Sequence, residues 1–194
     1  MGRPTVHDAD ALLDAAVALF ARGGVRAVTM AAVAREARAP SGSVYHRFPD
    51  RGSLLAALWQ RTARDFEAAY RAVLGPRPTA DAVVEGAVWI VDWCRANPGV
   101  AAVLDAGAQT FEPGTWPDDI RRAHTAAVRV RDRELAALVD TLAADTGVAH
   151  DEIAFAMVGL PIAVVSGHLR VAEPVPAGAT DLVRRLSSRV LGLG

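Results

Sequence analysis

A chain of 194 residues with 52% hydrophobic and 22% charged side chains is long enough to bury a core and too apolar to remain disordered. Its net charge of −1 does not by itself mark a nucleic-acid binder, although residues 1–51 hold seven arginines against five acids, a balance of +2 that leaves −3 on the remainder. The single cysteine, Cys94, excludes an intrachain disulfide, so we expect a reducing compartment and a small core side chain there.

No apolar run approaches the roughly 18 residues that a membrane span requires. The acids Asp8, Asp10 and Asp14 interrupt any signal-peptide pattern at the N-terminus. We therefore expect a soluble, cytoplasmic protein with no membrane partner.

The N-terminal part of the chain predicts two amphipathic helices. Residues 8–22 carry apolar side chains with helical spacing, and Gly23 and Gly24 follow as a C-cap. Thr29 is a good N-cap for a second helix with the same kind of stripe. A tight turn through Arg38 then leads to the next element.

A third short helix is predicted over residues 40–48, with proline well placed at its start. Val44 and Phe48 fall on one side of this helix and anchor it. Its other side and flanks carry small or polar residues, namely Gly42, Ser43, Tyr45 and His46. Three helices with a tight turn before the last predict a helix-turn-helix, in which the last helix enters the major groove of DNA. A short amphipathic surface helix is the alternative for this stretch taken alone.

These stretches resemble a known family. Residues 12–24, 29–37 and 41–49 are similar in order and spacing to the N-terminal domain of the TetR family of bacterial transcriptional regulators, most specifically in the run Gly-Ser-Val-Tyr-His-Arg-Phe-Pro. The resemblance implies an all-α fold with a three-helix DNA-binding domain over 1–51 and a helical ligand-binding and dimerisation domain over 52–194. One departure is Arg38, which stands where the family usually has glycine in the turn.

The resemblance also implies which residues face DNA. Tyr45 and His46 would contact phosphates and base edges, and a flexible arm with Arg3 would reach the duplex. Tyr45 packed half-buried in the domain is the alternative. The predicted DNA-binding residues are Thr29, Ser41, Gly42, Ser43, Tyr45, His46 and Arg51.

The remainder of the chain predicts further helices, with no strand signal and no internal repeat. Residues 52–74 form a connecting helix, which Gly75 and Pro76 end. Residues 110–116 form a loop with two exposed-looking aromatics. The other predicted helices cover 80–96, 99–109, 117–145, 151–172 and 180–191.

The helix over 117–145 combines a predicted buried stripe of Ile120, Ala127, Leu138 and Leu142 with His124, Arg131 and Glu134 on the same side. Two interpretations remain open. Either Arg131 and Glu134 form an i, i+3 pair with His124 bonded to a carbonyl, or these side chains line an effector cavity. The predicted effector-pocket residues are Trp89, Trp93, Phe111, Trp116, His124, Arg131 and Phe155.

The helix over 151–172 is apolar almost all round, so two different partners must cover it. One sector has small side chains that allow close approach of another helix, and Pro161 should kink the helix. The predicted dimer interface, which resembles the four-helix interface of the family, comprises Ala156, Gly159, Ala163, Gly167, Leu182, Leu186 and Val190. Packing within one subunit is the alternative.

No catalytic constellation is apparent in the sequence. The five histidines have no metal-ligand spacing and no glycine-rich phosphate loop is present, so we expect neither an enzyme nor a cofactor or metal. The expected function is that of a homodimeric repressor that binds a palindromic double-stranded DNA operator and is released by a small-molecule effector. The alternatives are a helical small-molecule-binding or catalytic domain with a vestigial helix-turn-helix, and a regulator that needs no ligand and recruits other proteins.

Overall fold

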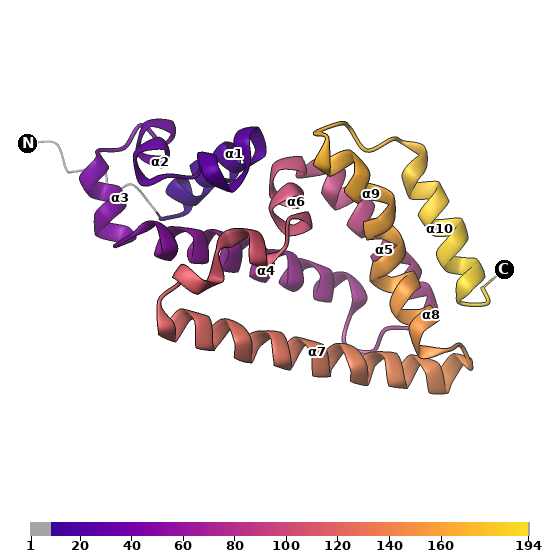
Figure 1. Cartoon of the computed structure of the whole chain (residues 1–194). Helices are drawn as coiled ribbons and strands as arrows, with labels where there is room; N and C mark the ends of the chain where they lie inside the picture. Colours follow the sequence, from indigo (N-terminus) through magenta and orange to yellow (C-terminus); the bar gives the residue numbers. More distant parts are fainter. Residues whose placement is uncertain (1–8, 194) are drawn as a thin grey trace, which may run out of the picture. The chain divides into compact units, whose positions relative to one another are not determined.

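The computed structural model describes residues 9–193, which form helices and no strand (Figure 1). The all-α prediction is therefore confirmed for this part of the chain, while the predicted arm residue Arg3 lies outside it. The helices are α1 (Ala9–Ala27), α2 (Met30–Glu36), α3 (Ser41–Arg47), α4 (Arg51–Leu74), α5 (Ala80–Ala96), α6 (Pro98–Asp105), α7 (Asp118–Thr146), α8 (His150–Ala154), α9 (Leu160–Arg170) and α10 (Gly178–Val190).

The chain divides into two compact units. Unit 1 comprises the described residues up to Ala63 together with Ala102–His124, and unit 2 comprises Arg64–Ala101 and the described residues from Thr125 onward. These units differ in extent from the predicted domains, because residues 52–63 and 102–124 group with the N-terminal helices.

In unit 1 the local sequence sets the ends of the first helices. Gly24 adopts a left-handed φ of 64°, which interrupts the helical geometry near the end of α1 as the glycine pair predicts. Thr29 is the N-cap of α2, and its hydroxyl oxygen accepts a hydrogen bond of 3.2 Å from the backbone N–H of Ala32. Asp50 plays the same role at α4, where the N–H of Ser53 donates to its carboxylate at 2.7 Å and lowers its pKa.

The segment between α6 and α7 corrects one sequence prediction. Instead of an exposed loop it forms two short 3-10 turns, Ala108–Phe111 and Pro113–Thr115. Phe111 is fully buried and stacks on Phe20 with ring centres 5.1 Å apart. The indole N–H of Trp116 donates to the carbonyl of Phe111 at 2.7 Å, which holds Trp116 inside as well. The segment is part of the core of unit 1, because burial of these large apolar rings lowers the free energy of the folded state.

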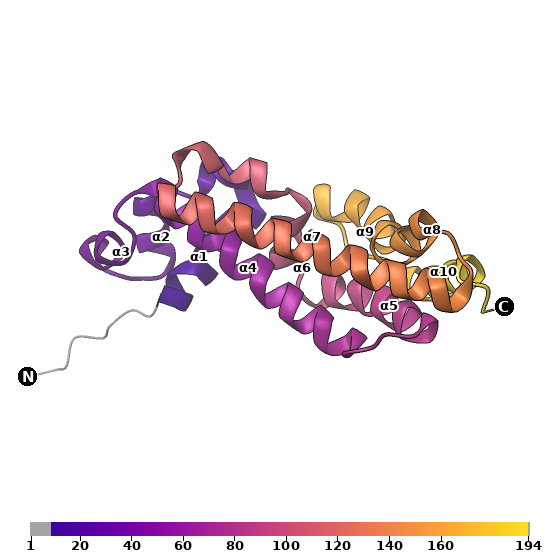
Figure 2. The same ribbon diagram turned by 90° about the horizontal axis from the view of Figure 1, so that it is seen from below.

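In unit 2, α5, α9 and α10 lie side by side (Figures 1 and 2). Their shared core includes Val91, Val165 and Val183, and Cys94 is buried in the same cluster. By length and hydropathy alone, the stretch His150–Arg170 could cross a membrane, so the prediction that no apolar run approaches that length is wrong. Because α9 packs on α5 and α10, its apolar side chains are explained by their place in the core of unit 2.

A single turn of π-helix, Phe155–Gly159, separates α8 from α9. Leu160 donates its N–H to Phe155 five residues back, and Pro161 has no N–H to donate. Two buried carbonyls are thereby left without helical donors. The hydroxyl of Ser187 donates to the Ala156 carbonyl at 3.2 Å, and the phenol of Tyr70 donates to the Met157 carbonyl at 3.1 Å.

The Tyr70 hydrogen bond leads to a first prediction. Burial raises the pKa of the Tyr70 phenol, so the group stays protonated and donates throughout the physiological pH range. Tyr70→Phe should lower the free energy of unfolding by about 1–2 kcal/mol, because the Met157 carbonyl stays buried without its donor. Urea unfolding followed by circular dichroism measures the change. Tyr45→Phe, at an exposed tyrosine, should leave stability unchanged, and equal stability of all three proteins would contradict the assignment.

Candidate nucleic-acid interface

The surface of α3 combines two buried anchors with exposed polar side chains. Val44 and Phe48 are buried, and the backbone N–H of Phe48 closes the helix by donating to the Val44 carbonyl at 2.8 Å. Tyr45 is 56% exposed, and His46 is exposed beside it. More than half of the Tyr45 surface is therefore open to solvent. A phenol and an imidazole on a fixed helix are suitable donors and acceptors for phosphates and base edges.

The other predicted contacts of this surface are placed as follows. Ser41 and Gly42 are exposed in the first turn of α3, and Ser43 is partly exposed. Thr29 is exposed at the start of α2, but its side chain already serves as the cap. Sequence reasoning missed Arg47, which is exposed in the last turn of α3. The sequence places this arginine directly after Tyr45 and His46, so it could have been included among the predicted DNA contacts.

The structure gives Arg51 a role different from the predicted phosphate contact. Its guanidinium donates to the carbonyls of Val28 and Val25, each at 2.9 Å, and forms an ion pair of 2.6 Å with Glu112. At the next position a Cβ on Gly52 would overlap the carbonyl oxygen of Thr115. Arg51 thus joins the end of α1 and the segment after α6 to the start of α4, which the sequence spacing does not reveal.

Arg38 leads to a second prediction. It adopts a φ of 51° in the turn before α3, the left-handed conformation that favours glycine. Arg38→Gly should raise the free energy of unfolding by about 1 kcal/mol, because it removes the steric strain of a side chain at positive φ. Thermal unfolding measures the gain. Arg35→Gly, within α2, is the matched control and should lower stability by about 1 kcal/mol; a loss of stability in both variants would contradict the strain.

The predicted effector residues fall in both compact units. Phe111, Trp116 and His124 belong to unit 1, where Trp116 and His124 meet edge to face with ring centres 5.2 Å apart. Trp89 and Trp93 belong to unit 2. They lie partly buried in a ring cluster with Phe66 and Tyr70, in which the Phe66 and Trp93 ring centres are 4.9 Å apart. The remaining two residues, Arg131 and Phe155, are exposed in unit 2.

The polar residues of α7 pair with α4 and not with each other. Arg131 binds Glu67 at 3.1 Å, and Glu134 binds Arg71 at 3.4 Å, so the predicted i, i+3 pair is absent among these described side chains. The predicted stripe is also partly wrong, since Ala127 is exposed whereas Leu142 is buried. Helical spacing correctly places these residues on one side of α7. However, the buried residues of α7 are Val139 and Leu142, which both lie in its C-terminal half.

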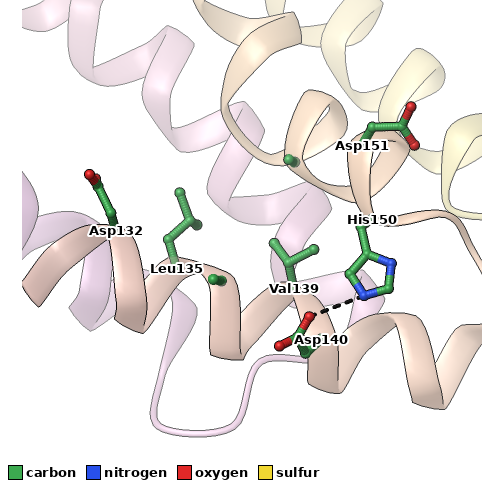
Figure 3. Close-up of a pocket in the computed structure, with 8 residues that line it drawn as sticks. Asp132, Leu135, Val139, Asp140, His150 and Asp151 are labelled. Atoms are coloured by element: carbon green, nitrogen blue, oxygen red, sulfur yellow. Dashed lines mark ion pairs between the residues drawn. The ribbon is translucent and has the colours of Figure 1, made fainter. Parts of the chain in front are cut away.

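Figure 3 shows an open depression in unit 2 where α7 passes α8. His150 on α8 reaches Asp140 on α7, with the imidazole Nε2 3.1 Å from a carboxylate oxygen. The lining residues are Asp132, Leu135, Ala136, Val139, Asp140, His150, Asp151 and Ala154, none of which the sequence identified as an effector contact. Within residues 9–193, no group of three His, Cys, Asp or Glu side chains is arranged to hold a metal ion.

The comparisons with known proteins bear on the helix-turn-helix region. Residues 12–58 match the sequence model described as bacterial regulatory proteins, tetR family. The N-terminal domain belongs to the TetR family. No curated protein matches the chain.

Solved structures of the same fold cover nearly the whole chain. A TetR-like transcriptional regulator from Rhodococcus sp. RHA1 is 21% identical, with a TM-score of 0.67 over 99% of this chain and 98% of that one. A TetR-family regulator from Marinobacter aquaeolei VT8 is 16% identical, with a TM-score of 0.70 over 94% of both chains. The fatty acid degradation regulator FadR from Bacillus halodurans is 16% identical, with a TM-score of 0.69 over 98% of this chain and 96% of that one. The chain thus shares the fold of these TetR-family proteins.

The predicted dimer residues divide by burial. Ala156 is fully buried, so it is corrected to a core residue of its own subunit. Phe155, predicted as an effector contact, is 48% exposed and lies beside Gly159, where a Cβ would press on its ring. In an all-apolar helix, spacing does not tell which side faces inward. Of the other predicted dimer residues, the exposed ones are Ala163, Gly167 and Leu182, and the partly exposed ones are Gly159, Leu186 and Val190.

Proposed function

We propose that the chain is a cytoplasmic repressor that binds a palindromic DNA operator as a homodimer and is released by a small-molecule effector. The observation that carries the proposal is the surface of α3, where Tyr45 and His46 are exposed above buried Val44 and Phe48. Because buried side chains anchor α3 to its domain, the helix loses little conformational entropy when its exposed side chains bind in a DNA groove. This is the arrangement that a sequence-reading helix requires.

An apolar surface of α9 and α10 supports the homodimer. Ile162 and Leu182 are large exposed hydrophobics, and Ala163 and Gly167 leave room for a close helix approach. Clustered exposed apolar side chains are typical of an interface. A twofold dimer would present two copies of α3 to half-sites about 34 Å apart, which is one turn of DNA.

Effector release requires only a modest difference in free energy. A ligand that binds better to a conformation unable to engage both half-sites shifts the population away from DNA. Coupling of about 1–3 kcal/mol lowers operator affinity roughly 5- to 150-fold, which is enough to relieve repression. The proposed chemistry is therefore binding and not catalysis.

Selection of duplexes from a random-sequence library tests this function. The intact protein should enrich an inverted repeat whose half-site centres are about 10 base pairs apart. Sedimentation of the free protein and of the complex should give a dimer in both. A library that stays random after several rounds, or enrichment by a protein that sediments as a monomer on a single half-site, would contradict the proposal.

A further inference from the structure

Two buried polar atoms on α4 have no hydrogen-bond partner among the residues that the structure describes. They are the indole Nε1 of Trp59 and the hydroxyl Oγ1 of Thr62. Trp59 is 9% exposed and Thr62 is 3% exposed. A buried donor without an acceptor costs free energy, so each such group in a folded protein calls for a physical explanation.

Comparable residues of the same chain do find partners. Two threonines of α7 each donate the hydroxyl to the carbonyl four residues back, Thr141 to Ala137 at 2.9 Å and Thr146 to Leu142 at 2.7 Å. The buried indole of Trp116 donates to Phe111. Thr62 is buried within a helix and makes no such bond, and Trp59 lies against the ring of Phe111 without using its N–H. The two atoms are therefore exceptions to the pattern of this chain.

The two groups share one side of the helix. Residues three apart on a helix are surface neighbours, about 5–6 Å apart at Cβ. An indole N–H can only donate, and a hydroxyl can donate, so an oxygen with two lone pairs would satisfy both at once. Aromatic rings lie close by, since the ring centres of Trp59 and Phe111 are 5.6 Å apart. This chemistry fits a flat apolar molecule with a carbonyl oxygen.

The charge of the surroundings favours a neutral carbonyl over a carboxylate. Arg61 is the arginine between the two residues in sequence, and its guanidinium is committed to Asp14 at 2.8 Å and to Asp10 at 3.5 Å. A buried carboxylate without a cation is much more costly than a buried ketone, ester or amide.

We propose that Trp59 and Thr62 recognise the effector, and that the effector is a flat apolar compound with a neutral carbonyl oxygen. This inference rests on the proposed function, because it names the ligand class of the regulator. Both atoms are shielded from solvent, so a ligand reaches them only after neighbouring side chains have moved. Such a ligand binds a second conformation in preference to the one described, which is the condition for shifting a population.

Three naphthalene probes of similar shape test the ligand class. They are 2-acetylnaphthalene with a ketone, 2-ethylnaphthalene without an acceptor, and 2-naphthoate with a carboxylate. By calorimetric titration, the ketone should bind the intact protein about tenfold more tightly than the hydrocarbon and more tightly than the acid. Equal affinity for ketone and hydrocarbon, strongest binding of the acid, or no binding of the ketone at millimolar concentration would overturn the inference.

Two variants remove one donor each. Thr62→Val and Trp59→Phe should each weaken ketone binding about three- to tenfold and leave hydrocarbon binding unchanged. In the ligand-free protein, Thr62→Val should raise the midpoint of thermal unfolding by about 2–4 °C, because a methyl group replaces an unpartnered hydroxyl. Thr141→Val, at an exposed threonine, is the control and should leave both readouts unchanged. A lower midpoint for Thr62→Val would mean that the hydroxyl has a structural partner, such as a bound water, and would overturn the inference.

The same preparations should be titrated with the selected operator. If the intact protein binds the operator but shows no preference for the ketone, the ligand inference alone fails. If it binds no duplex, the proposed function fails independently of the naphthalene results.

Discussion

Replacing Phe111 by alanine is expected to lower the free energy of unfolding by about 3–5 kcal/mol. Phe111 is fully buried, and its ring meets Phe20 at 5.1 Å and Trp59 at 5.6 Å between ring centres. The substitution removes the transfer free energy of the ring and leaves a cavity between α1 and α4. Denaturant unfolding of the two proteins, followed by circular dichroism, measures the loss.

Phe155→Ala is the matched control for Phe111→Ala. The same side chain is removed, but from a position that is 48% exposed, so the loss should be less than about 1 kcal/mol in the monomeric state. Similar losses from the two variants would show that the segment after α6 does not form part of the core of unit 1.

The double variant Tyr45→Ala, His46→Ala should weaken operator binding by about 100-fold or more. Contacts to base edges and phosphates contribute about 1–3 kcal/mol each, and both protomers lose them. Stability should stay within about 0.5 kcal/mol of the parent, because both side chains are exposed. Fluorescence anisotropy with the selected duplex measures the affinity. Arg129→Ala, at an exposed position of α7, should bind as the parent does, and an unchanged affinity for the double variant would contradict the placement of α3.

The features predicted well from the sequence depend on neighbours in the chain. A threonine caps its own helix, a glycine accepts positive φ, and helical spacing puts Val44 and Phe48 on one side of α3. Each of these effects acts within a few residues, so the sequence alone contains the needed information. Arg38 stands where the resembled family usually has glycine, and its φ of 51° is the left-handed conformation that glycine adopts most easily.

The features predicted poorly depend on residues far apart in the chain. Phe111 was predicted in a loop with an exposed-looking ring, but Phe20, 91 positions earlier in the chain, packs on this ring in the core. Arg51 was predicted to contact a phosphate, but in the structure its N–H groups donate to two carbonyls of unit 1 and to Glu112. Ala156 has the same spacing as the exposed small residues of α9, but it is fully buried, and the hydroxyl of Ser187 donates to its carbonyl.

The most direct test of the account is an anisotropy titration of the intact protein with the selected duplex and with a duplex of the same composition in scrambled order. We expect an affinity at least about 1,000-fold higher for the selected duplex at physiological salt, with most of that preference lost in the Tyr45→Ala, His46→Ala variant. Equal affinity for the two duplexes, or a preference that survives the double substitution, would contradict the claim that α3 reads the operator.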